Sequence, residues 1–351
     1  MELLKKPLKE YLVHRFGPGA VLEKATRFPR GSSRLTWFID YRPEPGAPVV
    51  SVIFRGDFEG GSTIRSSLEQ EYFMYERLGH TNVPVAKVLG WEDDPEWAVR
   101  PFYVREQIQG SWEVPNYTNP DPVYDEMRIA ISKEHLSKLA IVHNIDWHAL
   151  GFNERLPVPA DEASCGAFFV ENILHSMEDF GEEPVPLVLE AVDWLKRNAP
   201  VAPRISLCKG TNGLGEEVLL NGKIVAMSDW EEASIGDPAA DFASLQDFIP
   251  EITRDGKHIW GMPQALAFYR EVSGINVTLE AVKFYQITRA LGTIGYGHSA
   301  AVIVQHGKAD IRQAWTGTEV FHLGKRILAA SIGLPVPIDA TWFGEMNETI
   351  Q

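Results

Sequence analysis

The stretch 207–243, LCKGTNGLGEEVLLNGKIVAMSDWEEASIGDPAADFA, limits what this chain can fold into more than any other part of the sequence. Its residues 223–228 predict a short strand that delivers Asp229 at its end, close to a glycine-rich loop. Asp237, which a proline follows, is typical of a helix start, and Asp241 falls one turn later on the same face. A carboxylate held at a strand end beside such a loop suits a metal ion; the alternative is that Asp229 only caps a turn.

Two parts of different character follow one another along the chain. Strands are expected where alternating and β-branched residues gather, at 35–41, 49–54 and 102–108. One helix interrupts these strands, over residues 66–78, with a serine as its cap. Helices are expected where apolar residues recur at helical spacing, at 131–142, 188–197 and 263–332. A small β-rich lobe followed by a larger helical lobe is therefore predicted.

The composition excludes several classes of partner. The chain carries 48 Asp and Glu against 33 Lys and Arg, a formal charge of −15, which gives no electrostatic reason to expect nucleic acid or an anionic membrane. No segment approaches the roughly 18 apolar residues that span a bilayer, and the first residues lack the features of a signal peptide. Cys165 and Cys208 show neither metal-ligand nor disulfide spacing. We therefore expect a cytoplasmic protein whose partner is a small molecule.

The stretch 207–243 resembles the aminoglycoside phosphotransferase/choline kinase family, the small-molecule branch of the protein-kinase-like fold. That family carries H-G-D-x-x-x-x-N, then D-W-[ED], then G-D-P-x-x-D-[LF]-A, and DWEEASIGDPAADFA at 229–243 matches the last two closely. LAIVHNIDWHALGF and FYVRE are similar to its L-A-x-L-H-x-[IV]-D helix end and its F-Y-V-M-E connector. The resemblance implies an α+β, bilobal kinase-like fold, with a β-rich N-lobe over 1–106 and a helical C-lobe over 107–351.

The resemblance also implies ATP as a cofactor, held partly by the N-lobe. Arg55 stands where the family has the basic residue of its third strand, and Glu71 stands at the helix position that pairs with it. Ser32 and Ser33 lie in a segment similar to the family's phosphate-covering hairpin. The alternative is that Arg55 is only a surface arginine and Glu71 only a solvated glutamate.

The remaining binding residues come from the connector and from the C-lobe. Val104 and Glu106 belong to the connector whose backbone would face the adenine ring. Asp229, with Glu216, would hold Mg²⁺ through carboxylate oxygens. Metal and cations are needed because the transferring phosphoryl group accumulates negative charge.

The sequence departs from the family at the catalytic loop. Aligned without gaps, H-G-D falls on Lys209, Gly210 and Thr211, and the family's Asn falls on Glu216. Thr211 has no carboxylate to accept the proton of a substrate, and Lys209 would bring a positive charge into the centre of the site. These three residues, Lys209, Thr211 and Glu216, are the catalytic candidates.

A one-residue slip is the alternative alignment. It would place Asn212 at the position of the missing carboxylate and Glu217 at the Asn position, but it breaks the spacing to Asp229. We therefore prefer the gapless alignment.

Three functions remain open from the sequence. The chain could be a small-molecule phosphotransferase in which Glu216, Glu217 or Glu231 replaces the missing carboxylate. It could bind a nucleotide or another ligand without transferring phosphate. It could use the cleft for a different reaction, with Lys209 as base or cation and Thr211 as a hydroxyl donor. Neither the substrate nor the oligomeric state follows from the sequence.

Overall fold

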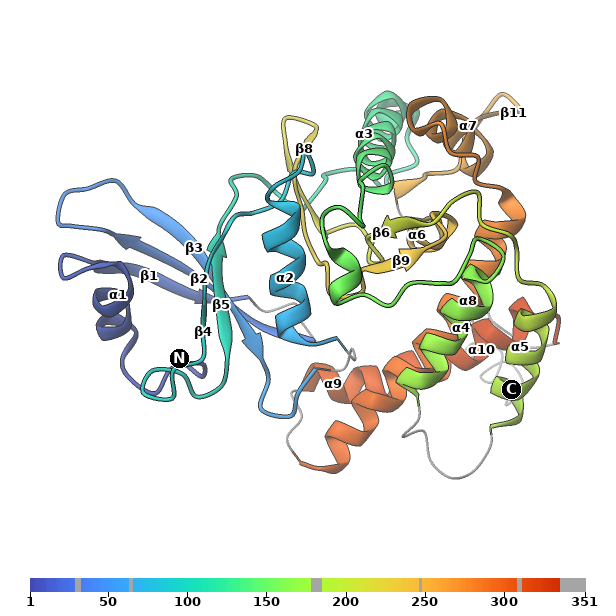
Figure 1. Ribbon diagram of the computed structural model, residues 1–351. Helices are drawn as coiled ribbons and strands as arrows, with labels where there is room; N and C mark the ends of the chain where they lie inside the picture. Colours follow the sequence, from blue (N-terminus) through green and yellow to red (C-terminus); the bar gives the residue numbers. More distant parts are fainter. Residues whose placement is uncertain (29–32, 63–65, 178–184, 246–247, 308–310, 335–351) are drawn as a thin grey trace, which may run out of the picture.

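The computed structural model describes residues 1–28, 33–62, 66–177, 185–245, 248–307 and 311–334. Figure 1 shows two parts side by side: a β-rich N-lobe, drawn in blue, and a larger, mainly helical C-lobe, drawn from green to red. The predicted α+β, two-lobed architecture is confirmed.

The N-lobe is built on an antiparallel sheet with the strand order β1-β2-β3-β5-β4. Its strands are β1 (Val21–Arg27), β2 (Arg34–Arg42), β3 (Val50–Asp57), β4 (Val88–Glu92) and β5 (Phe102–Glu106). The edge strand β1 was not predicted. Most of its side chains are exposed, so it lacks the apolar alternation by which a strand is recognised.

The two faces of this sheet contact different parts of the molecule, because successive side chains of a strand point to opposite faces. Val52 and Phe54 of β3 belong to the N-lobe core, which packs against α1 (Leu8–Phe16). Ile53 and Arg55 of the same strand face the other way and line a cavity. The sheet therefore presents one apolar face to its own core and one mixed face to the C-lobe.

Helix α2 (Leu68–Leu78) lies between the lobes (Figure 1). Ser67 caps it, accepting a hydrogen bond of 3.0 Å from the backbone N–H of Gln70, so the predicted helix and its cap are confirmed. Its apolar side chains belong to the same hydrophobic cluster as the C-lobe core. This packing holds Glu71, which is fully buried, at the junction of the lobes.

The C-lobe is mainly helical. Its α-helices are α3 (Asp125–His143), α4 (Cys165–Ser176), α5 (Pro186–Arg197), α6 (Ala239–Ser244), α7 (Met262–Ser273), α8 (Leu279–Gln305), α9 (Ile311–Trp315) and α10 (Phe321–Ser331). Single turns of other helix types lie at Pro122–Tyr124, Phe152–Glu154 and Thr316–Val320. Helix α4 was not predicted, since its glycine and its aromatic and β-branched residues have low helix propensity.

Short strand pairs carry the loops of the C-lobe. They are β6 (Ser206–Cys208) with β9 (Ser234–Gly236), β7 (Glu217–Leu220) with β8 (Lys223–Met227), and β10 (Ile252–Arg254) with β11 (Lys257–Trp260). Asn221 and Gly222 join β7 to β8 with φ of 52° and 73°, the left-handed pair that a two-residue hairpin requires. Because β8 ends at Met227, it delivers Asp229 just beyond its end, as predicted.

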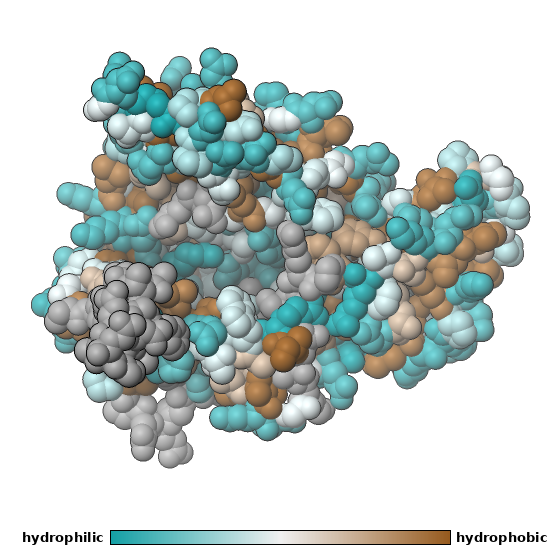
Figure 2. Space-filling model, turned by 180° about the vertical axis from the view of Figure 1, so that it is seen from behind, coloured by the Kyte–Doolittle hydropathy of each residue, from teal (hydrophilic) through white to brown (hydrophobic). Residues whose placement is uncertain are grey.

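On the surface seen from behind, hydrophilic and hydrophobic residues are interspersed, and the N-lobe projects to the right of the rest (Figure 2). Within the described ranges, no helix combines the length and the apolar character needed to cross a membrane. Strand β5 ends at Glu106, the residue at which the sequence predicts the end of the N-lobe. That boundary between the lobes stays a prediction.

Candidate functional site

A cavity of about 740 Å³ separates the mixed face of the N-lobe sheet from the C-lobe. Strands β2, β3 and β5 line it on one side; the loop after β6, the segment around Asp229, α4 and α8 line it on the other. Five residues that the sequence assigned to one site line this cavity: Ser33, Arg55, Thr211, Glu216 and Asp229.

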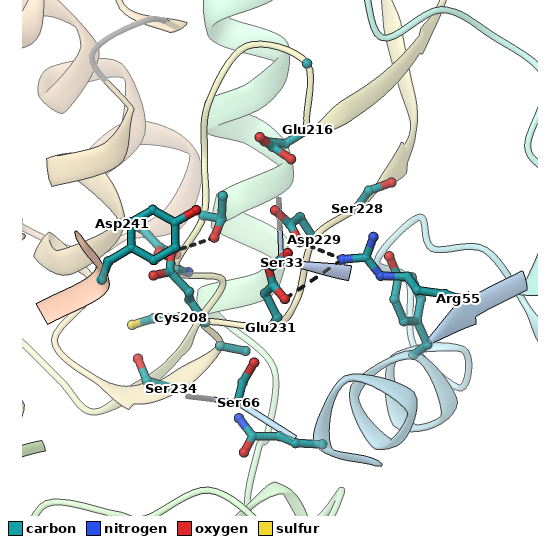
Figure 3. A pocket seen from close by; sticks show the side chains of 18 of the residues that line it. Ser33, Arg55, Ser66, Cys208, Glu216, Ser228, Asp229, Glu231, Ser234 and Asp241 are labelled. Carbon is teal, nitrogen blue, oxygen red and sulfur yellow. Dashed lines mark hydrogen bonds and ion pairs between the residues drawn. The ribbon is translucent and has the colours of Figure 1, made fainter. Parts of the chain in front are cut away.

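Arg55 connects the two lobes. Its Nε lies 2.7 Å from Glu71 Oε1, and its Nη2 lies 3.3 Å from Asp229 Oδ1. Figure 3 shows Arg55 reaching across from the N-lobe, with dashed lines to Asp229 and Glu231. Burial opposes the charge of the guanidinium, but these carboxylates, with Tyr103, outweigh it and hold the pKa of Arg55 above its usual value. The two side chains that the sequence paired, Arg55 and Glu71, are therefore in contact.

A second buried arginine, Arg34 at the start of β2, was not expected. It pairs with Asp57, and its Nε lies 3.6 Å from Glu71 Oε2 and 3.5 Å from Glu231 Oε2. Glu71 and Glu231 thus each face both Arg34 and Arg55. The register could have indicated this, because alternation along β2 places Arg34 on the same face of the sheet as Arg55.

Ser33, the residue before β2, contacts this charged cluster. Its Oγ donates a hydrogen bond of 2.7 Å to Glu231 Oε1. Burial and the neighbouring Asp229 raise the pKa of Glu231, while the nearby arginines oppose that shift. Ser32, the other serine named from the sequence, lies outside the described residues.

The connector was expected to meet a ligand through its backbone at Val104 and Glu106, and two other residues present their side chains to the cavity. Val104 packs into the N-lobe core, and the backbone N–H of Glu106 donates to the carbonyl oxygen of Lys87 at 2.9 Å. Arg105 and Gln107 line the cavity instead. Alternation along β5 explains the difference, because neighbouring residues of a strand point to opposite faces.

Asp229 and Glu216 form a carboxylate pair on the C-lobe side. Asp229 adopts a left-handed backbone, with φ of 65°. Burial and the charge of the neighbouring Asp229 raise the pKa of Glu216 to about 8, although Lys209 opposes the shift. Two carboxylates in contact repel each other unless a proton or a cation lies between them. This donor set fits a hard divalent cation such as Mg²⁺, which prefers oxygen ligands.

Asp241 of α6 anchors the loop that follows β6. Its Oδ2 accepts the backbone N–H of Lys209 at 2.8 Å, and its Oδ1 accepts that of Gly210 at 2.7 Å. Gly210 has φ of 86°, and a Cβ there would lie 2.3 Å from the backbone oxygen of Glu232. The glycine of the loop is therefore required by both its conformation and its surroundings.

His143, Cys208 and Asp241 bring three potential metal ligands within 4.8 Å of one another, all of them buried. His143 places one ring nitrogen 2.8 Å from Asp241 Oδ2 and the other 2.6 Å from the hydroxyl of Tyr269. Burial raises the pKa of the Cys208 thiol well above its usual value. Because its polar atoms already hold the loop and the helices together, this group is structural.

Lys209 does not bring its charge into the open centre of the site, contrary to the expectation from the sequence. The side chain is fully buried; its Nζ lies 3.1 Å from Glu217 Oε1 and donates to the carbonyl oxygen of Thr211. Glu217 in turn lies 3.1 Å from His135 Nε2. Burial opposes the charge, but Glu217 outweighs it and holds the pKa of Lys209 above its usual value. Lys209 and Glu217 therefore form a buried ion pair beneath the loop.

Thr211 lies beside Glu232, a carboxylate that the sequence did not single out as the orienting group. Its Oγ1 donates a hydrogen bond of 2.7 Å to Glu232 Oε2, and Arg289 Nη1 of α8 lies 3.8 Å from the same oxygen. Both Glu232 and Arg289 line the cavity. The only trace in the sequence is the second glutamate of DWEE, which the family pattern does not specify.

The far wall of the cavity is of mixed character. Helix α4 contributes Phe169 and Asn172, and helix α8 contributes Tyr285, Gly292 and Ser299 among other residues. Apolar walls with a few polar groups, enclosing a volume of this size, are typical of sites for small organic molecules.

Solved structures of other proteins share this architecture. A putative aminoglycoside phosphotransferase from Ralstonia eutropha JMP134 has a TM-score of 0.67, with 20% identity over 93% of this chain and 97% of its own. A thermostable mutant of aminoglycoside phosphotransferase APH(4)-Ia, in ternary complex with AMP-PNP and hygromycin B, has a TM-score of 0.55, with 14% identity over 90% of this chain and 98% of its own. At such identities these similarities establish the kinase-like fold.

The sequence places the chain in a family. Among curated proteins, the probable acyl-CoA dehydrogenase IBR3 of Arabidopsis thaliana is 26% identical over 75% of this chain and 34% of its own length. The chain spans about a third of the length of the curated relatives it matches. The model of the phosphotransferase enzyme family matches residues 24–272. Because that match covers most of the chain, the protein belongs to the phosphotransferase enzyme family.

Proposed function

We propose that this protein binds a nucleoside triphosphate with Mg²⁺ in the cavity and transfers a phosphoryl group to a hydroxyl group of a small molecule. The observation that carries the proposal is the position of Arg55, whose guanidinium contacts both Glu71 of the N-lobe and Asp229 of the C-lobe at the cavity wall. Family membership supports the reaction class, and the complex of APH(4)-Ia with AMP-PNP supports a nucleotide. A cytoplasmic location stays a prediction from the sequence.

On the nucleotide side, each proposed role follows from charge and position. Arg55 binds phosphate oxygens, and Glu71 holds its guanidinium in place through the 2.7 Å contact. Ser33 can exchange its hydrogen bond with Glu231 for one with a phosphate. The backbone of the connector at Val104 and Glu106 stays the proposed neighbour of the base.

Mg²⁺ would be held by Asp229 and Glu216. When bound, the ion neutralises the charge that develops on the phosphate oxygens. The fit rests on the position of both carboxylates on the same wall of the cavity and on the partial burial of Glu216. Arg55 limits the freedom of Asp229, since its Nη2 lies 3.3 Å from Oδ1.

On the acceptor side, we assign the orienting role to Glu232 together with Thr211. The Thr211 hydroxyl donates to one oxygen of Glu232, which leaves further lone pairs to accept the hydroxyl hydrogen of a substrate. The three carboxylates that the sequence offered for this role are engaged elsewhere. Glu217 pairs with Lys209, Glu231 faces the arginines, and Glu216 lies against Asp229.

A second candidate, a binding protein without transferase activity, is favoured by one observation: Thr211 has no carboxylate of its own. The third possibility, a different reaction that uses Lys209 as base, lacks support. Its amine is fully buried, paired with Glu217, and has a raised pKa.

The test has two steps on the purified protein. Calorimetric titration with ATP and with GTP, each with and without Mg²⁺, measures binding; nucleotide consumption in the presence of a panel of hydroxylated small molecules measures transfer. Mg²⁺-dependent binding followed by acceptor-dependent consumption is the expected result. Binding without consumption would identify the non-catalytic protein, and no binding of either nucleotide at millimolar concentration would overturn the proposal. Asp229→Asn should remove the Mg²⁺ dependence of binding.

A further inference from the structure

Arg105 of β5 is a buried cation that forms no ion pair with the described residues. Only 9% of the residue is exposed, and it lines the cavity. Its guanidinium lies 5.2 Å from the centre of the Tyr75 ring, and its Nε has no hydrogen-bond partner in the part of the chain that the structure describes. No carboxylate in the described ranges forms an ion pair with it, whereas Arg34 and Arg55 each contact several. A buried donor without an acceptor is costly, so a ligand that supplies the acceptor would relieve that cost.

The register of the sheet places Arg105 next to the phosphate site. Phe38, Ile53 and Arg105 form one cross-strand row on β2, β3 and β5, because Phe38 pairs with Ile53 and Ile53 pairs with Arg105. Arg55 belongs to the next row on the same face, opposite Tyr103. Two residues along a strand span about 6.6 Å. A nucleotide whose phosphates contact Arg55 therefore has its sugar and base within reach of the row of Arg105.

The surroundings of this row suit a planar base. Phe38 and Trp112 line the cavity with their rings nearly parallel, 10° apart in orientation, and with centroids 6.5 Å apart. Beside Arg105, Gln107 lines the cavity, and its Oε1 is buried without a hydrogen-bond partner. The row and its neighbours Trp112 and Gln107 thus offer apolar surface for the faces of a ring, a fork of donors from Arg105, and an acceptor from Gln107.

We infer that the nucleotide of this cavity carries a 6-oxopurine base, guanine or hypoxanthine, in preference to adenine; the inference rests on the proposed function. The guanidinium of Arg105 donates to the O6 and N7 acceptors of the base, the pairing that arginine makes with guanine elsewhere. The amide of Gln107 accepts the N1–H that both 6-oxopurines carry. Adenine presents an amino group in place of O6 and has no hydrogen on N1. The donors of Arg105 would then face another donor, and the acceptor of Gln107 would face another acceptor.

The experiment compares the dissociation constants of GTP, ITP and ATP, measured by calorimetry with Mg²⁺ on the wild-type chain. GTP and ITP should bind roughly 5- to 150-fold more tightly than ATP, the range expected from one good bidentate contact. In Arg105→Met the affinity for GTP and ITP should fall by a similar factor, while that for ATP stays within about threefold. Arg42→Met, on β2 and in an exposed ion pair with Glu23, is the matched control and should leave all three constants unchanged.

Each result supports or overturns the inference. If wild-type protein binds ATP as tightly as GTP and ITP, base selection by Arg105 is overturned while the proposed function stands. If Arg105→Met weakens all three nucleotides equally, Arg105 acts on the phosphates and the inference is also overturned. If no nucleotide binds, the proposed function itself falls. The wild-type comparison needs no variant, so an unstable Arg105→Met protein leaves the inference testable.

Discussion

The two ends of the cavity, where we propose that the nucleotide and the acceptor bind, differ in how their charged groups are paired and exposed. At the nucleotide end, the side chains of Arg34 and Glu71 are 1% and 0% exposed, and each charged group faces several of opposite sign. At the acceptor end, the side chains of Arg289 and Glu232 are 46% and 38% exposed and meet at 3.8 Å. The first end matches the family pattern at Arg55, Glu71 and Asp229, and the second departs from it at Thr211.

Burial explains why the two ends differ in how freely their residues can be exchanged. A charge removed from water must keep its partner, since an unpaired buried charge costs several kcal/mol. Solvent-exposed groups contribute little to stability, so a carboxylate can move from one position to a neighbouring one without unfolding the chain. The pair of Thr211 and Glu232 is such an arrangement: the carboxylate lies one hydrogen bond from the position where the family pattern places it. The comparison therefore predicts losses of stability at one end and losses of turnover at the other.

The largest effect is expected at the acceptor end, from Glu232→Gln. The amide keeps the size of the side chain and can still accept the hydrogen bond of Thr211, but it cannot take a proton. We expect kcat to fall about 10²- to 10⁴-fold, the usual contribution of general acid–base catalysis. The measurement is nucleotide consumption with the most active acceptor, alongside calorimetric titration of the nucleotide, whose affinity should not change.

The control for this variant is Glu190→Gln, an exposed glutamate on α5 away from the cavity lining. Both variants should unfold within about 0.5 kcal/mol of the wild type. An unchanged kcat in Glu232→Gln would remove Glu232 from the reaction and with it the functional half of the comparison.

At the nucleotide end, Arg34→Met should lower the free energy of unfolding by about 3–5 kcal/mol. The substitution removes a positive charge from beside Glu71 and Glu231, and Asp57 loses its ion-pair partner. Urea denaturation measures the effect. Arg197→Met, which breaks a pair with Asp193 that is 64% exposed on both sides, is the control and should cost less than about 1 kcal/mol. Equal losses in the two variants would show that burial does not distinguish these arginines.

A buried carboxylate that forms no ion pair with the described residues sharpens the comparison further. Asp237, at the start of α6, accepts the backbone N–H of Ala239 at 2.9 Å, and burial raises its pKa to about 6 from 3.8. The native state therefore holds this proton more tightly than the unfolded chain, so the stability that the group contributes is lost as the pH rises from about 4 to about 6. Asp237→Asn stays neutral, and its stability relative to wild type should rise by about 1–2 kcal/mol between pH 5 and pH 7. Urea denaturation at the two pH values tests this, and a pH-independent difference would contradict it.

Whether a feature of the fold or of the site could be predicted from the sequence depended on whether it leaves a local pattern there. The two-lobed fold, the capped helix α2 and the strand that delivers Asp229 follow from local patterns and from the family resemblance, and the structure contains them. Arg34 could be found only from the register that pairs β2 with β3, which the sequence does not supply. The inward side chain of Lys209 depends on which side of its loop packs against the C-lobe, and no local pattern shows that. Glu232 escaped for a third reason: an exposed side chain is not restricted by packing, so its position follows from the folded loop rather than from a pattern.

The smallest effect is expected for Arg289→Gln, which breaks the exposed pair with Glu232. The distance of 3.8 Å and the exposure of both side chains predict a loss of less than about 1 kcal/mol in urea denaturation. High salt should reduce even that loss, because ions screen exposed charges. The two ends of the cavity would then differ by several kcal/mol for the removal of one arginine. A loss in Arg289→Gln as large as that in Arg34→Met would mean that the acceptor end is as rigidly paired as the nucleotide end, and exposure could no longer explain why the family pattern holds at one end and changes at the other.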